Sequence, residues 1–132
     1  MTLTTGASSV ALDEAESELG VAWPPSLREL LAASDGLQGA HGVGVVWSVG
    51  RIVRDNRAFR DSADFRELYM PFEHLLFFGD AGDGDQFAFP ILAGAIRSED
   101  VFVWRHETDS RAWLAPSLER YLRVALVGAS AG

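Results

Sequence analysis

The chain has 132 residues, the length of a single domain, and 48% of them are hydrophobic, which favours a packed core over disorder. It has no cysteine, which excludes disulfides, thiolate metal sites and a cysteine nucleophile. Its net charge is −8, and this acidity argues against nucleic-acid binding, because phosphate contacts need basic groups.

The N-terminal part predicts two short helices. In ALDEAESELG, Leu12, Ala15 and Leu19 recur at helical spacing, and Gly20 can supply a left-handed cap. In VAWPPSLRELLAASDGL, the two prolines suit the start of a helix, and Gly36 is expected to end it. We expect these helices to pack as a hairpin.

The middle of the chain predicts a strand and then a helix. The strand is the β-branched run GVGVVW at residues 42–47, and Ser48 can cap a helix or helical turn that buries Ile52 and Phe59. Four arginines recur there every three residues and are expected on a solvated face: Arg51, Arg54, Arg57 and Arg60. The polar segment Asp61–Pro71 is expected to be irregular.

The C-terminal half predicts three strands and a helix. EHLLFFG and DQFAFPIL read as strands, the first apolar on both faces and therefore central, and DVFVWRH alternates as a third strand. Ser117 can cap a final helix that Gly128 ends. Because strands follow one another through short connections, the sequence predicts one α+β domain over residues 1–132, with its core at about 9–127. Its sheet is expected to be mostly antiparallel, with the N-terminal hairpin and the C-terminal helix packed on it.

A turn rich in aspartate separates the first two of these strands. FFGDAGDGDQFAF places Asp80, Asp83 and Asp85 within six residues, which suggests calcium, but the spacing is not that of a calcium-binding loop. We interpret it as a turn in which three glycines supply positive φ and aspartates bond nearby amides: Gly79, Gly82 and Gly84. We expect no metal and no other cofactor.

No catalytic motif is present in the sequence. The three histidines, His41, His74 and His106, fall in separate predicted elements, and no G-x-S-x-G elbow occurs. The paired acids Glu99 and Asp100 are explained by the start of a strand. We therefore expect a protein that is not an enzyme. One alternative stays open, a hydrolase whose carboxylate or metal site lies around Asp80–Asp85 and needs His74 or His106 to converge with these acids.

The order of these signals resembles a known family. LDEAESELGVAWPPSLRELLAASDGL resembles the opening signature of the SUKH superfamily, the Smi/Knr-like domains, in which a helix ending in LG precedes a proline-led second helix and a D-G. LLFFGDAGDGDQFAF resembles the family's strand, G-D turn and G-D-aromatic strand, and VFVWRHET followed by APSLERYL resembles its closing strand and helix. The match spans Leu12 to Leu126, whereas the segment Arg54–Phe72 matches nothing in the pattern.

The resemblance implies a non-catalytic protein-binding module in which Gly79, Asp80, Gly84 and Asp85 shape the family's recurring loop. Many bacterial relatives are immunity proteins that neutralise polymorphic toxins, often nucleases, and an alternative is a regulatory or scaffold domain with another protein client. A basic partner suits the charge, since residues 61–100 carry nine carboxylates and two arginines, a net of −7.

We expect a basic partner to dock on the strand-end acids, which are Asp80, Asp83, Asp85, Glu99 and Asp100. With no signal peptide and no apolar run of membrane length, we expect a cytoplasmic protein that binds neither membrane nor nucleic acid. The sequence leaves the oligomeric state open.

Overall fold

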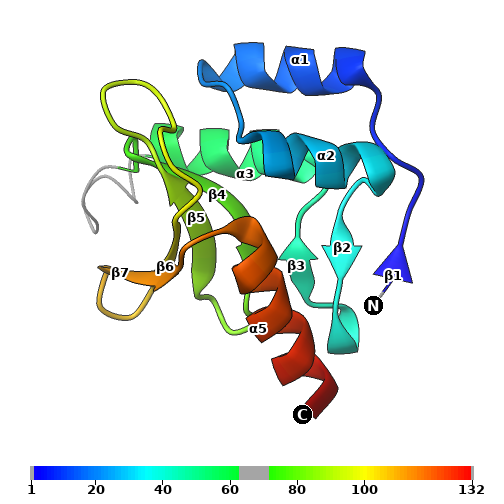
Figure 1. Ribbon diagram of the computed structural model, residues 1–132. Helices are drawn as coiled ribbons and strands as arrows, with labels where there is room; N and C mark the ends of the chain where they lie inside the picture. The colour runs from blue at the N-terminus through cyan, green and yellow to red at the C-terminus, as the bar shows by residue number, and fades with distance from the viewer. Residues whose placement is uncertain (1, 63–71, 132) are drawn as a thin grey trace.

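The structure, a computed structural model, describes residues 2–62 and 72–131 (Figure 1). Its helices are α1 (Ser9–Leu19), α2 (Pro25–Ala33), a short 3-10 turn η1 (Ala40–Gly42), α3 (Val49–Asp61) and α5 (Leu118–Ala131). Its strands are β1 (Thr2–Leu3), β2 (Leu37–Gln38), β3 (Gly44–Val46), β4 (Leu75–Asp80), β5 (Gln86–Pro90), β6 (Val101–Arg105) and β7 (Ser110–Ala115).

All strand pairs are antiparallel, in one sheet of order β1-β2-β3 and one of order β4-β5-β6-β7. The two sheets meet where the amide of Trp47, just after β3, donates to the carbonyl of Phe78 in β4 at 2.7 Å. Strand β4 therefore lies between β3 and β5, the central place predicted from its apolar faces. The fold is the single α+β domain with an antiparallel sheet that the sequence predicts.

Three strands of the structure are missing from the sequence prediction. The strands β1 and β2 have two residues each, too short to show a pattern. The strand β7, SRAWLA, has no β-branched residue, so its strand propensity is low. Pairing with β6, from Val101 opposite Ala115 to Arg105 opposite Ser110, holds it in the sheet instead.

Helix starts agree with the prediction better than helix ends do. The hydroxyl of Ser48 accepts from the amide of Arg51 at 3.3 Å, and Ser117 caps the first turn of α5 in the same way. The prediction that α2 ends at Gly36 is wrong, because the helix stops at Ala33 with Ser34 as its cap. The prediction that Gly128 ends the last helix is also wrong, since α5 continues to Ala131. Glycine costs a helix about 1 kcal/mol relative to alanine but does not forbid it.

The helices pack around the sheet in two groups (Figure 1). Helix α1 lies along α3, and it is tied to α2 because Arg28 reaches both Asp13, at 3.0 Å, and Glu16. The expected hairpin is thus joined by ion pairs, while α3 is the helix against which α1 packs most closely. Helix α5 contacts β7, β3 and α2.

The core fills both faces of β4. On one face Phe77 meets Phe59 of α3 edge-on, with ring centres 5.1 Å apart. On the other face Phe78 stacks on Phe89 at 4.6 Å and meets Tyr121 of α5 edge-on at 5.2 Å. The alternation of side chains along a strand sends neighbours to opposite faces, so one central strand holds helices on both sides.

Two buried polar groups fix the helices to the strands. Asn56 of α3 donates to the carbonyl of Phe77 at 2.8 Å and accepts from its amide at 2.9 Å, which pairs the helix with β4. Tyr121 of α5 donates to the carbonyl of Val45 in β3 at 2.6 Å. Burial raises the pKa of this phenol, so Tyr121 keeps its proton and remains a donor.

The segment Arg54–Phe72, for which the sequence analysis finds no resemblance, is described in part. Residues 54–61 form the second half of α3, so the predicted helix extends through them. The prediction of irregular structure at 61–71 falls, from residue 63 onward, outside the described residues. Of the helices that are described, none combines the length and apolar character needed to cross a membrane.

Candidate functional site

The five carboxylates expected to face a partner lie at the two ends of the sheet. Asp80, Asp83 and Asp85 surround the turn between β4 and β5, whereas Glu99 and Asp100 precede β6. Because Gln86 pairs with Trp104 and Ala88 with Phe102, the start of β5 lies beside the end of β6. The two groups are therefore separated by the length of β6, about 16 Å.

Asp80 is held inside the protein by three donors. Its Oδ2 accepts from the indole Nε1 of Trp47 at 2.6 Å and lies 3.3 Å from Nη2 of Arg51. Its Oδ1 accepts from the amide of Gly82 at 2.8 Å. The guanidinium of Arg51 also sits over the Trp47 ring at 4.3 Å from its centre. Asp80 thus joins β3, α3 and the turn, which is the shaping role that the family resemblance implies.

Asp83 also shapes the turn. It is exposed, and its Oδ1 accepts from the amide of Asp85 at 3.0 Å, an aspartate turn of the kind predicted. Gly82 and Gly84 have positive φ, of 86° and 105°, as expected. The expectation for Gly79 is wrong, because its φ is not positive. It is glycine for a different reason, since a Cβ there would lie 2.1 Å from the carbonyl oxygen of Val45.

Asp85 binds the end of β6. Its Oδ1 lies 2.8 Å from Nδ1 of His106 and accepts from the His106 amide at 3.1 Å. Hydrogen bonding to His106 holds the pKa of the Asp85 carboxyl below its ordinary value, and the charge of Arg105, 3.9 Å away, acts in the same direction. A Cβ on Gly84 would lie 2.7 Å from the His106 ring, so the imidazole packs on bare backbone. These contacts close the turn onto β6.

The meeting of Asp85 with His106 is the convergence that a hydrolase would need, but the other parts of such a site are not found with it. In residues 2–62 and 72–131, no hydroxyl is bonded to His106, and His74 is exposed on its own at the start of β4. The same residues contain no group of three or more histidine, aspartate or glutamate side chains able to hold a metal. What the structure shows for the pair is a contact that joins the turn to the end of β6.

The other end of β6 presents a different surface. Asp100 accepts from Ser98 at 3.0 Å and from the indole Nε1 of Trp113 on β7 at 3.2 Å. The side chain of Trp113 is 56% exposed, unlike the buried Trp23, Trp47 and Trp104. Glu99, beside Asp100, has no hydrogen-bond or ion-pair partner among the described residues. The indole of Trp113 is thus exposed and is held in one orientation by the carboxylate of Asp100.

Sequence reasoning did not single out Trp113 as the exposed tryptophan. Any of the four tryptophans, if exposed, would be an anchor for a partner, but exposure is not written in the local sequence. Alternation along SRAWLA gives no such signal, because it places Trp113 on the same face as Arg111, whose side chain is only 16% exposed and lies over the Phe72 ring.

The fold defines a small single α+β domain. The SUKH_6 family model, described as SMI1-KNR4 cell-wall, matches residues 10–122. The chain therefore belongs to the SMI1-KNR4 family, as the order of its motifs indicates. No curated protein matches the chain.

Proposed function

We propose that the chain is a non-catalytic protein-binding module that acts as an immunity protein, binding and neutralising a toxin domain in the cytoplasm. The observation that carries binding is Trp113, exposed and oriented by Asp100 with Glu99 beside it. Aromatic residues at the centre of an interface supply much of the binding energy, and surrounding charges select the partner. Neutralisation of a toxin rests on what membership of the family implies.

The charge of the chain supports a basic partner. Its net charge is −8, and residues 61–100 alone carry −7. Many toxin nucleases are basic because they bind phosphate, and an acidic inhibitor attracts them over distance and orients them. Charges at the rim of an interface act mainly on the association rate, which falls as salt rises.

A second candidate is a regulatory or scaffold domain with a different protein client. Immunity and regulation would use the same binding surface. Only the identity of the bound protein therefore distinguishes the two functions. A toxin-domain gene beside the gene for this chain favours immunity, whereas an isolated gene with no secretion-linked neighbour favours regulation. The hydrolase candidate has less support, since Asp85 and His106 are engaged with the turn and with β6.

The test of the proposal is rescue. Each toxin domain encoded beside the gene is expressed alone and together with this chain, and survival and complex formation are measured. We expect one toxin to be neutralised and to co-purify with the chain. If none of the neighbouring toxins is neutralised or bound, the immunity function is refuted.

The docking surface is tested on that complex. Glu99→Lys should lower the association rate at low salt and reduce its salt dependence, and Trp113→Ala should cost about 2 kcal/mol or more of binding. Asp83→Lys tests the other end of the sheet in the same way, although it also removes the acceptor for the Asp85 amide. Glu29→Lys, an exposed site on α2, is the charge-matched control. If Asp83→Lys and Glu99→Lys both associate like the parent at low salt, the docking surface is not at the strand ends.

A further inference from the structure

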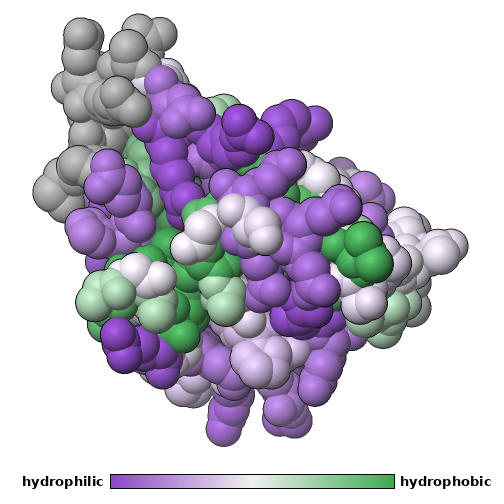
Figure 2. All heavy atoms as spheres, turned by 90° about the horizontal axis from the view of Figure 1, so that it is seen from above, coloured by the Kyte–Doolittle hydropathy of each residue, from purple (hydrophilic) through white to green (hydrophobic). Residues whose placement is uncertain are grey.

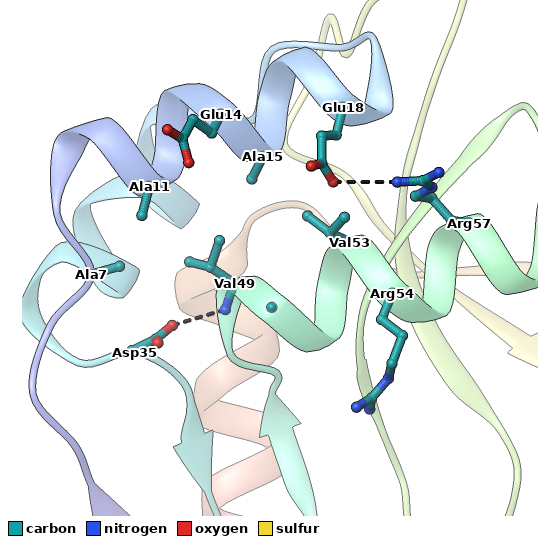
Figure 3. A pocket seen from close by; sticks show the side chains of 11 residues that line it. Ala7, Ala11, Glu14, Ala15, Glu18, Asp35, Val49, Val53, Arg54 and Arg57 are labelled. Carbon is teal, nitrogen blue, oxygen red and sulfur yellow. Dashed lines mark hydrogen bonds and ion pairs between the residues drawn. The ribbon is translucent and has the colours of Figure 1, made fainter.

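A groove of about 640 Å³ runs between α1 and α3 (Figure 3), and none of the strand-end carboxylates lines it. Small and apolar side chains of the two helices point into it, among them Ala11 and Ala15 from α1 and Val49 and Val53 from α3. Its volume lies within the range of about 300–1,000 Å³ that is typical of ligand-binding clefts. The groove is therefore large enough to take several side chains of another molecule.

The face above the groove has little other apolar surface. Viewed from the side of α1, the molecule is mostly hydrophilic, with small and separate hydrophobic patches (Figure 2). A broad hydrophobic contact over α1 is thus excluded, and a ligand approaching this side gains apolar burial chiefly by entering the groove.

The charges at the groove are arranged unevenly. Glu18 of α1 and Arg57 of α3 form an ion pair across it, with N and O 3.6 Å apart, which neutralises both (Figure 3). Arg54 pairs with Asp55 at 3.1 Å and points away from the groove. Glu14 lies on the rim and has no hydrogen-bond or ion-pair partner among the described residues. The charge left to meet a ligand is therefore negative.

Gly50, in the first turn of α3, has no structural explanation within the chain. Its φ is not positive, and a Cβ built on it meets no atom within 4 Å. Gly20 and Gly94 also border open space, but both have positive φ, which explains them. Glycine is the least favourable residue in a helix after proline, so alanine would be the better choice for folding alone. A bare backbone at the groove instead lets another chain approach closely.

We propose that this groove binds an amphipathic helix of a partner protein, whose apolar side chains enter between α1 and α3 and whose arginine or lysine lies over Glu14. A helix is the occupant that fits, because two neighbouring helices form a groove that receives the ridge of a third, and small residues at the contact shorten the distance between axes. The proposal goes beyond the proposed function, because it assigns a second binding surface that contains neither Trp113 nor the strand-end carboxylates.

The test uses two synthetic helical peptides with the same leucine stripe, one edged with arginine and one with glutamate. Each is titrated into the full isotope-labelled chain, and amide shifts are followed by NMR. We expect the arginine-edged peptide to shift the amides of Ala11, Gly50 and Val53. Gly50→Met should weaken its binding about tenfold, because the new side chain fills the space that a leucine would enter. Glu14→Arg should weaken the arginine-edged peptide and strengthen the glutamate-edged one.

Two control variants separate the groove from general effects. Gly50→Ala leaves the groove open and should bind like the parent, and Glu29→Arg places the same charge change on α2 and should also bind like the parent. Absence of amide shifts up to millimolar peptide, shifts only outside the groove, or equal binding of both peptides would each overturn the proposal. If Gly50→Met fails to fold, the exposed Glu14→Arg variant decides alone. The toxin rescue does not use these peptides, so either result can fail without the other.

Discussion

At the scale of single residues, the aspartates of the β4–β5 turn are distinguished by what they bond. Asp80 accepts from the buried indole of Trp47, and Asp83 accepts from the backbone amide of Asp85. Asp85 bonds both the backbone amide and the ring Nδ1 of His106. Only Asp83 among them is exposed. Three residues of one type in six positions therefore stabilise three different connections.

Asp85→Asn should destabilise the protein near neutral pH and have less effect in acid. Because His106 lowers the folded-state pKa of Asp85, the ionised carboxylate is more stable in the folded protein than in the unfolded chain. That stabilisation is complete above the ordinary aspartate pKa of about 4 and disappears as the pH falls through the lower folded value. Urea unfolding of parent and variant at pH values on either side of 4 measures the difference. A penalty that is equal at all pH values would contradict the assignment.

At the scale of elements, the junction of β3 with β4 depends on one glycine. The backbones approach so closely that the carbonyl oxygen of Val45 occupies the place where a side chain of Gly79 would begin. The hydrogen bond from Trp47 to Phe78 lies beside this contact and completes it. The close approach is what makes one continuous layer of two short sheets.

Gly79→Ala should lower the free energy of unfolding by about 3 kcal/mol, because the added methyl group meets rigid backbone and forces the two strands apart. Gly50→Ala is the matched control in the helix α3, where nothing opposes the methyl group and stability should rise by up to about 1 kcal/mol. Chemical denaturation of the two variants gives both values. Equal effects at the two glycines would mean that the strands at Gly79 separate easily.

Helix starts were predictable from sequence at this scale, and long-range pairings were not. The Ser48 and Ser117 caps are local, since the hydroxyl bonds an amide three residues on. The contact of Asp85 with His106 instead depends on the register of β5 against β6, and no local pattern gives that register. For the same reason the sequence could place five acids at strand ends but could not assign them to opposite ends of one strand.

At the scale of the whole molecule, hydrogen bonds join helices to strands that are distant in sequence. Tyr121 near the C-terminal side of the fold donates to Val45, and Asn56 of α3 satisfies both backbone groups of Phe77. Asn56 and Tyr121 are both buried. If one of these hydrogen bonds is broken, its backbone partner is left unpaired in apolar surroundings, which is costly. The domain should therefore unfold as one unit.

Tyr121→Phe should lower stability by about 1–3 kcal/mol while keeping a single transition, because the ring remains and only the bond to the Val45 carbonyl is lost. Thermal unfolding followed by far-ultraviolet circular dichroism and by tryptophan fluorescence should give coincident curves in parent and variant. Separate midpoints for the two signals, or two stable fragments after limited proteolysis, would instead indicate independent halves.

The bond between Tyr121 and Val45 also bears on how the protein is made. Strand β3 leaves the ribosome long before α5. The carbonyl of Val45 and one apolar face of β4 therefore lack their partner, Tyr121, until α5 has been synthesised. Domains fold as units during synthesis, at about 5–20 residues per second. The nascent chain must therefore remain open, with its central strand uncovered, until Leu118 and Tyr121 have left the exit tunnel. In that interval the exposed apolar surface of β4 makes the chain prone to aggregation.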